Sequence, residues 1–348
     1  PYQDNGIKIF SRDGFKLPDE KEDEIEALLL SESRIGMHEE SSEVGKAYSF
    51  EDAGGRYIVF LKNSFPADYT LEGMKIVLDC SNGATYRIAP EIFYELGAEV
   101  ITLFADPDGR NINKNCGSQH PETLAREVVE KGADAGFAFD GDGDRLIAVD
   151  EKGTVLTGDQ IMVVCAAAMK KQGKLKNDLV VSTVMSNIGF GLAIKDLGIK
   201  TIKSDVGDRY VLKEMLDNGA VLGGEDSGHL IFLDHHSTGD GILSAIQLLR
   251  AMKYEGRPLS ELGSIMKIFP QILINIDVTS KPDLATVPEV VDVIAAVEAE
   301  LGTSGRVLVR YSGTQKMCRV MVEGPTREQT ELCCRRIADV ISEKIGKK

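Results

Sequence analysis

A strand–helix–strand pattern that occurs twice is the strongest constraint on the fold of this 348-residue chain. In both copies Ser-Asn stands before the helix and Leu-Gly closes it, and apolar residues line the flanking strands. We therefore expect two copies of one α/β domain. The expected strands are residues 74–78, 99–103, 179–182 and 199–202, and the expected helices are residues 88–96 and 186–197.

The segments outside the repeat predict further parts of the fold. Before it, a short strand at residues 7–10 and an acidic helix at residues 19–30 lead to a linker helix that Pro66 ends. After it, strands and helices from about Phe269 onward predict an α+β domain. The sequence thus predicts tandem α/β domains followed by a C-terminal α+β domain. The expected divisions are residues 1–65, 66–158, 159–266 and 267–348.

Charge and cysteine content narrow the function. The chain has 40 Lys and Arg against 55 Asp and Glu, a formal charge of −15, which disfavours nucleic acid and acidic membranes as partners. No apolar run approaches the ~20 residues of a membrane span. Six cysteines without a C-x-x-C pair indicate a cytoplasmic protein without a disulfide framework. The first residues contain neither an initiator Met nor a signal peptide, and we expect them to lie part-way through a longer chain.

The densest chemical signal is the alternation of Asp and Gly over residues 140–145. Asp140, Asp142 and Asp144 can converge on one hard cation, because the intervening glycines let the backbone curl, and Arg145 follows at once. A solvated acidic turn is the plain alternative, but it does not require this strict alternation. The motif predicts a Mg²⁺ site with open positions for water and a phosphoryl oxygen.

An EF-hand is a closer rival for these residues. The three aspartates and Glu151 match loop positions 1, 3, 5 and 12, but Arg145 stands where position 6 needs Gly. Apolar, strand-like residues flank the loop instead of amphipathic helices. We therefore reject the EF-hand.

Two further motifs are typical of phosphosugar recognition. Residues 223–229 place Glu225, Ser227 and His229 on a Gly-flanked turn, where they can bind sugar hydroxyls. Residues 310–314 combine Arg310, two hydroxyls and a Gly turn into a candidate phosphate cradle between two strands. Taken alone, the first also fits a capped turn and the second a polar hairpin, and Arg209 on another turn also fits a surface ion pair.

Together, Asp-Gly-Asp-Gly-Asp-Arg, Gly-Glu-Asp-Ser-Gly-His and Arg-Tyr-Ser-Gly-Thr resemble the metal, sugar and phosphate loops of the α-D-phosphohexomutase family, in the same order and over essentially the whole chain. Residues 115–122, 206–212 and 229–241 are most similar to bacterial members that act on glucosamine phosphates. The resemblance implies four domains. It also implies a phosphoserine in a Ser-His-Asn-Pro motif whose Pro is Pro1, so we expect the nucleophilic serine upstream of Pro1.

The resemblance also implies an activity: interconversion of glucosamine 6-phosphate and glucosamine 1-phosphate through a glucosamine 1,6-bisphosphate intermediate. This reaction belongs to amino-sugar and cell-wall precursor synthesis. Lys8 and Arg145 become candidate catalytic residues, with Lys8 as general acid/base or phosphate contact and Arg209 as added positive charge. The resemblance implies that Asp140, Asp142 and Asp144 bind Mg²⁺. It implies that the sugar is bound by Glu225, Ser227 and His229, and that the phosphate is bound by Arg310, Ser312, Gly313, Thr314 and Arg319.

The match has departures and leaves alternatives open. Tyr311, Gln315 and Lys316 stand where many family members have Pro, Glu and Pro, so we expect a differently shaped phosphate loop that still binds phosphate. Phosphomannomutase or phosphoglucomutase activity is one alternative function. A phosphosugar-binding fragment, inactive without its N-terminal segment, is another. The expected partner is a small phosphosugar, and a homodimer is left open.

Overall fold

The computed structural model describes all residues except 13, 32–45, 47, 50–51, 313–314 and 348. Backbone contacts divide the chain into two compact units, and neither is one continuous segment. The first consists of Pro1–Val184 and Lys200–Gly263, and the second of Met185–Ile199 and Ser264–Lys348.

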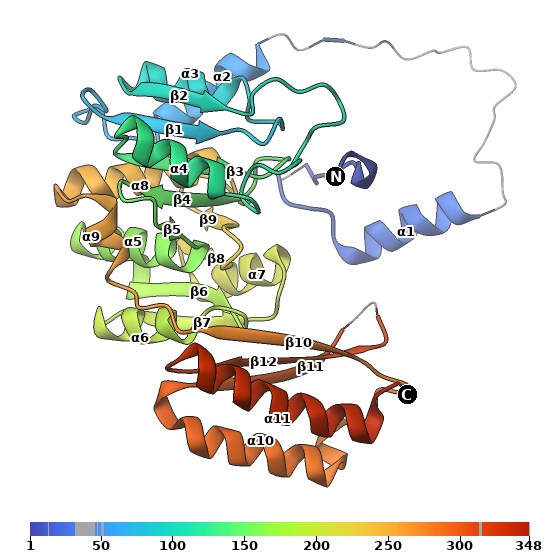
Figure 1. Cartoon of the computed structure of the whole chain (residues 1–348). Coiled ribbons are helices and arrows are strands. Elements are labelled where there is room, and N and C mark those ends of the chain that lie inside the picture. Colours follow the sequence, from blue (N-terminus) through green and yellow to red (C-terminus); the bar gives the residue numbers. More distant parts are fainter. Residues whose placement is uncertain (13, 32–45, 47, 50–51, 313–314, 348) are drawn as a thin grey trace, which may run out of the picture. The chain divides into compact units, whose positions relative to one another are not determined.

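A five-stranded sheet of order β2-β1-β3-β4-β5 begins the first unit (Figure 1). β1 pairs in parallel with β2 and β3, and β4 runs antiparallel to β3. The strands are β1 (Lys75–Asp79), β2 (Glu99–Leu103), β3 (Ala135–Phe139), β4 (Leu146–Asp150) and β5 (Val155–Leu156), and the nearby helices are α2 (Ala53–Lys62), α3 (Ile88–Glu95) and α4 (Glu122–Lys131).

Buried side chains hold helices against this sheet. Val128 of α4 packs with Val77 and other apolar side chains of the sheet. In α3, Phe93 stacks on Phe137 of β3 with ring centroids 5.9 Å apart. Gly136 lets α4 pack this close to β3, because a Cβ there would come within 2.9 Å of a Leu124 methyl group. The first unit therefore supports β3, and with it the loop that follows, on a closely packed layer.

A second sheet in the same unit has the order β7-β6-β8-β9. β6 pairs in parallel with β7 and β8, and β9 runs antiparallel to β8, which repeats the arrangement of the first sheet. This confirms the tandem α/β domains expected from the sequence. The elements are α5 (Gly158–Lys171), β6 (Leu179–Thr183), β7 (Lys200–Ser204), α7 (Asp208–Asn218), β8 (Leu222–Gly224), β9 (Leu230–Phe232), α8 (Gly241–Glu255) and α9 (Leu259–Gly263).

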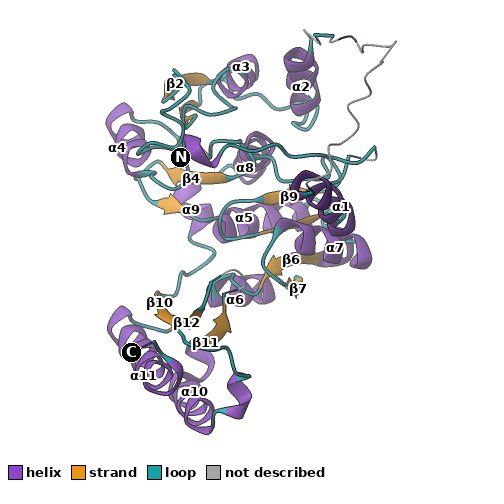
Figure 2. Ribbon diagram, turned by 90° about the vertical axis from the view of Figure 1, so that its right-hand side faces the viewer, coloured by secondary structure: helices purple, strands orange, loops and turns teal. Residues whose placement is uncertain are grey.

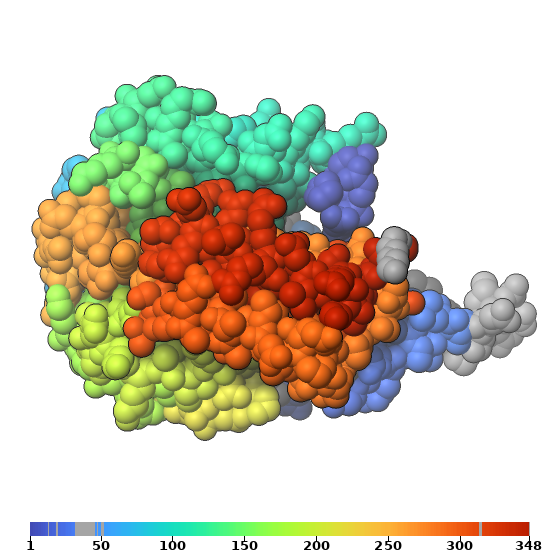
Figure 3. All heavy atoms as spheres, turned by 60° about the horizontal axis from the view of Figure 1, so that its bottom comes forward, coloured from blue at the N-terminus to red at the C-terminus, as the bar shows by residue number. Residues whose placement is uncertain are grey.

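The second unit contains the antiparallel sheet β10-β12-β11, which confirms the expected C-terminal α+β domain. Apolar residues of α10 and α11 pack with those of the sheet in one core, and the two helices lie side by side in Figure 2. In the view of Figure 3 the residues of this domain, coloured from orange to red, form one continuous surface. The elements of this unit are α6 (Ile188–Asp196), β10 (Gln271–Asp277), α10 (Pro288–Leu301), β11 (Arg306–Tyr311), β12 (Met317–Glu323) and α11 (Arg327–Ile345).

A buried ion pair joins α6 to the C-terminal sheet within the second unit. The fully buried Glu323 accepts hydrogen bonds from the backbone N–H of Ile188, at 2.9 Å, and from Nε of Arg306, at 3.1 Å. Arg306 in turn donates to the carbonyl of Ser186 at 2.9 Å. Because a buried carboxylate is stable only when its oxygens are paired, this contact fixes the turn before α6 on the sheet.

The N-terminal residues correct one expectation. The helix expected at residues 19–30 is present as α1 (Asp19–Leu30), but residues 7–10 form no strand. Only Phe10 makes an isolated bridge, to Lys16, because among the described residues no strand lies beside this segment to complete a ladder. Short 3-10 helices occur at Tyr2–Asp4, Lys176–Asp178, Leu284–Thr286 and Gly302–Ser304.

Other expectations concern the membrane, the cysteines and the domain limits. In the part of the chain that the structure describes, no helix is long and apolar enough to cross a membrane. All six cysteines are buried free thiols. The four-domain division of the chain stays a prediction.

Candidate active site

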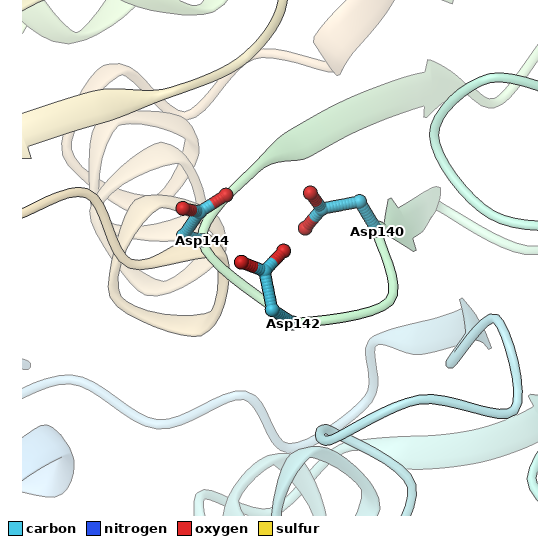
Figure 4. A group of neighbouring side chains, drawn as sticks. All are labelled: Asp140, Asp142 and Asp144. Carbon is cyan, nitrogen blue, oxygen red and sulfur yellow. The ribbon is translucent and has the colours of Figure 1, made fainter. Parts of the chain in front are cut away.

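The three aspartates lie on the short loop between β3 and β4, which pair antiparallel as a hairpin. Figure 4 shows the side chains of Asp140, Asp142 and Asp144 pointing toward one another. One oxygen from each carboxylate lies within 4.8 Å of the others. Gly143 has a φ of +78°, which the tight loop requires and L side chains rarely adopt.

The clustered negative charges of this loop favour a bound cation. Burial and the charges of Asp144 and Asp142 raise the pKa of Asp140 to about 7. Lys8 contacts both Asp142 and Asp144, the latter at 2.8 Å. Against the effect of burial, the Lys8 hydrogen bond lowers the pKa of Asp142, and hydrogen bonds from His229 and Lys8 lower the pKa of Asp144. Three carboxylate oxygens in reach of one point are the hard donors that Mg²⁺ prefers, so the residues fit that ion.

Lys8 stays protonated in this setting. Burial opposes its charge, but hydrogen bonds to Asp142 and Asp144 raise the pKa of the ammonium well above its usual range. A protonated lysine can contact phosphate or donate a proton, and the role of Lys8 as general acid/base or phosphate contact stays a prediction.

The candidate sugar loop, residues 223–229, lies directly beside the metal loop. The backbone N–H of Leu146 donates to the carbonyl of Gly228 at 3.0 Å, and Arg145 and His229 form a β-bridge. A Cβ at Gly228, whose φ is +93°, would come within 2.8 Å of the Leu146 carbonyl carbon. The backbones of the two loops therefore lock against each other.

His229 is buried between two fixed groups. Its Nε2 accepts a hydrogen bond from the backbone N–H of Gly239 at 3.2 Å. In the neutral ring the proton therefore sits on Nδ1, which lies 3.6 Å from Oδ2 of Asp144. This places His229 next to a candidate metal ligand, where it can orient the carboxylate.

Glu225 and Ser227 lie on a turn beside the start of α7, which bears Arg209. Glu225 Oε1 accepts the backbone N–H of Gly207 at 2.9 Å, which ties its carboxylate to the start of that helix, and Ser227 is exposed. Arg209 pairs with Glu22 of α1 at 3.2 Å.

Arg145 faces the carboxylates without a tight ion pair. Its Nε lies 3.8 Å from a carboxylate oxygen of Asp140 and 3.9 Å from one of Asp144. This nitrogen atom is buried and has no hydrogen-bond partner among the described residues. An unsatisfied guanidinium N–H at this point is available to an anionic oxygen.

The candidate phosphate cradle lies in the second unit. Arg310 on β11 stands directly opposite Arg319 on β12. Cross-strand neighbours of this kind have Cβ atoms about 5 Å apart, so two guanidinium groups share one face. The Nε of Arg319 is buried without a hydrogen-bond partner among the described residues. Like charges placed opposite each other are destabilising unless an anion lies between them.

The loop after Arg310 adds a cation that the sequence did not indicate. Lys281 donates to the carbonyl of Ser312 at 2.6 Å, and the Ser312 hydroxyl accepts the N–H of Gln315 at 3.3 Å. Gly313 and Thr314, which the sequence also predicts to bind phosphate, lie outside the described residues.

The residues that hold the metal loop in place were not predicted from the sequence. Asp79, fully buried at the end of β1, accepts backbone N–H groups of Ser81 at 2.9 Å and Gly117 at 2.8 Å. Burial raises the pKa of Asp79 to about 6. The two segments that it joins hydrogen-bond to the metal loop: Ala84 N–H to the Gly141 carbonyl and Ser118 N–H to the Phe139 carbonyl, both at 2.9 Å. The Ser-Asn-Gly turn after the strand was the one visible signal of this support.

Gly83 gives a test of this support. A Cβ at Gly83 would come within 2.8 Å of the Gly141 Cα and carbonyl carbon, so Gly83→Ala must displace the metal loop. We expect about tenfold weaker Mg²⁺ binding by calorimetry, as for other substitutions behind metal ligands. Gly191→Ala, where nothing lies within 4 Å of the new Cβ, is the control and should bind Mg²⁺ normally. Equal Mg²⁺ affinity in both variants would contradict the role of the turn.

Comparison with known proteins finds phosphohexomutase domains over most of the chain. Family models of phosphoglucomutase/phosphomannomutase match residues 55–153 (alpha/beta/alpha domain II), 157–269 (alpha/beta/alpha domain III) and 273–340 (C-terminal domain). The phosphoglucosamine mutase of Syntrophus aciditrophicus is 67% identical over 346 residues, which are 99% of this chain and 77% of that protein. That of Syntrophobacter fumaroxidans is 60% identical with the same coverage of both proteins.

Solved structures share the fold. N-acetylphosphoglucosamine mutase of Aspergillus fumigatus, solved with GlcNAc-6P and magnesium, matches with a TM-score of 0.67 at 18% identity, over 82% of this chain and 69% of that one. A phosphoglucomutase/phosphomannomutase family protein of Burkholderia thailandensis matches with a TM-score of 0.67 at 21% identity, over 84% of this chain and 66% of that one. The chain therefore belongs to the phosphoglucomutase/phosphomannomutase family and is an enzyme of the isomerase class, a phosphohexomutase.

Proposed function

We propose that this phosphohexomutase interconverts glucosamine 6-phosphate and glucosamine 1-phosphate. The relatives at 60–67% identity carry the name of that activity. The observation that carries the proposal in the structure is the hydrogen bond from Leu146 to Gly228, because it holds the acidic loop and the candidate sugar loop together.

Phosphate at the two ends of the substrate needs two kinds of site. Asp140, Asp142 and Asp144 would hold Mg²⁺, which when bound neutralises negative charge on phosphoryl oxygens. Arg310 and Arg319, with Ser312, Gly313 and Thr314, would hold the phosphate that is not reacting. Arg145, whose Nε has no hydrogen-bond partner among the described residues, and the protonated Lys8 supply further donors beside the acidic loop.

The sugar would be held beside the acidic loop, within the first unit. Glu225, Ser227 and His229 supply hydrogen-bonding groups for ring hydroxyls from one turn, and Arg209 adds positive charge at the start of α7 beside it. The overall reaction then balances as two transfers. A phosphoserine gives its phosphoryl group to the free sugar hydroxyl, and the resulting glucosamine 1,6-bisphosphate returns its other phosphoryl group to the serine oxygen.

The test compares glucosamine, glucose and mannose 1-phosphates side by side in a mutase assay with Mg²⁺ and bisphosphate. The protein tested includes the serine-bearing segment that the resemblance places before Pro1. We expect the highest kcat/KM with the amino sugar. A preference for mannose or glucose phosphate would overturn the substrate assignment. Calorimetric binding without turnover in that protein would favour the phosphosugar-binding alternative.

A further inference from the structure

A cavity of about 1480 Å³ borders the acidic loop within the first unit. Asp140 and Asp142 line it, and so do Arg110 and Lys114 from the long loop that follows β2. The function proposed above uses neither of these two cations. Their place beside the acidic loop raises the question of what they bind.

The backbone that carries these cations is held in place by its own polar groups. Asp108 accepts the N–H groups of Arg110 at 2.7 Å and Asn111 at 2.8 Å through one oxygen. The Asn111 amide donates to the carbonyl of Asp106 at 2.9 Å. Further on, the N–H of Asn113 donates to the Ser81 carbonyl at 2.9 Å, beside the turn that supports the metal loop. The loop thus presents Arg110 and Lys114 from a fixed position.

Neither cation is neutralised by a neighbouring acid. Both side chains are exposed, and among the described residues no carboxylate forms an ion pair with either of them. Asp108, the acid nearest in sequence, accepts from backbone N–H groups instead. Lys8, which lines the same cavity, is held by Asp142 and Asp144. Arg110 and Lys114 therefore leave two positive charges free toward the cavity.

Such charges matter in a protein whose net charge is −15. A doubly charged phosphate ester is repelled by the protein as a whole, and a local cationic wall can reverse this repulsion inside a cleft. Arginine and lysine are also the side chains that bind phosphate oxygens most strongly. The exposed amide side chain of Gln119 lines the same cavity and can bind sugar hydroxyls or phosphate oxygens.

We propose that Arg110 and Lys114 form a phosphate-capture subsite, which attracts the phosphate group of an incoming hexose phosphate into the cavity beside the acidic loop. The proposal deepens the proposed function, on which it rests for the identity of the sugar. The subsite increases the rate at which substrate binds, so it raises kcat/KM. It does not change kcat, which depends on the residues at the reacting phosphate.

The test removes both charges together and compares a matched control. Arg110→Ala with Lys114→Ala is set against Lys176→Ala with Lys200→Ala, two exposed lysines of the same unit that do not line the cavity. Both double variants lose two positive charges, so the long-range charge of the protein changes equally. Both variants are made in the protein that includes the serine-bearing segment. The readouts are kcat/KM and kcat for glucosamine 1-phosphate, and calorimetric binding of inorganic phosphate, each at low and high salt.

We expect the first variant to lose about tenfold in kcat/KM and in phosphate affinity at low salt, with kcat unchanged. The loss should shrink toward ~1 M salt, where charges are screened within about 3 Å. The control should change less than twofold. Equal losses in the two variants, or no loss in the first, would overturn the subsite. If glucosamine phosphate is no substrate, the proposed function fails while the phosphate-binding arm still decides the subsite.

Discussion

Asp142→Asn should weaken Mg²⁺ binding about a hundredfold or more while the protein stays folded. The substitution removes one of three anionic donors and leaves the loop glycines and both flanking strands in place. Because substitutions behind metal ligands already cost about 10–100-fold, loss of a direct ligand should cost at least as much. Calorimetry with Mg²⁺ measures the affinity, and thermal unfolding without metal checks the fold.

A matched control separates the ligand from general charge. Asp217→Asn makes the same change on α7, where the carboxylate pairs with Lys213 and lies outside the acidic loop. It should bind Mg²⁺ as the parent does. Unaltered Mg²⁺ affinity in Asp142→Asn would remove the metal assignment.

Arg310→Ala should raise KM for every phosphosugar by roughly tenfold to more than a hundredfold. The residue is proposed to hold a phosphate that all these substrates share, and a charge-assisted bidentate contact is worth about 1.5–3 kcal/mol. Steady-state kinetics with glucosamine, glucose and mannose phosphates measure the effect. Arg310→Lys should recover only part of it, since lysine keeps the charge and loses the fork geometry.

Arg327→Ala serves as the control for Arg310. It removes an exposed arginine at the start of α11 in the same unit and should leave KM unchanged. An increase in KM confined to one sugar would show that Arg310 recognises the ring instead of the phosphate.

The sequence predicted well the features that depend on local pattern. The repeated unit is present as two sheets that share the order of their first four strands, because buried strands and helix ends leave regular apolar and Gly signals. The strand expected at residues 7–10 was wrong, because apolar alternation cannot show whether a partner strand is available. The convergence of the three aspartates followed from their spacing on one short loop.

Features that depend on tertiary packing could not be predicted. Asp79 looks like any aspartate at the end of a strand until the fold brings Gly117 to its second oxygen. The sequence placed Arg310 in the loop between two strands, with Arg319 at the start of the second, whereas the structure places Arg310 on β11, directly opposite Arg319 on β12. The roles proposed for these residues stay predictions until they are tested.

The division of the chain into interleaved units has a consequence for synthesis on the ribosome. Residues 185–199 form one unit with residues 264–348 but leave the ribosome long before them. The sheet of the second unit is therefore not yet made when β6 and β7, which precede and follow α6 in the sequence, can already pair. During that interval the N–H of Ile188 lacks Glu323 and the side chain of Asn187 lacks Phe269. Translation that stops near Gly263 therefore yields a chain in which α6 lacks its hydrogen-bond partners, a state that chaperones would recognise.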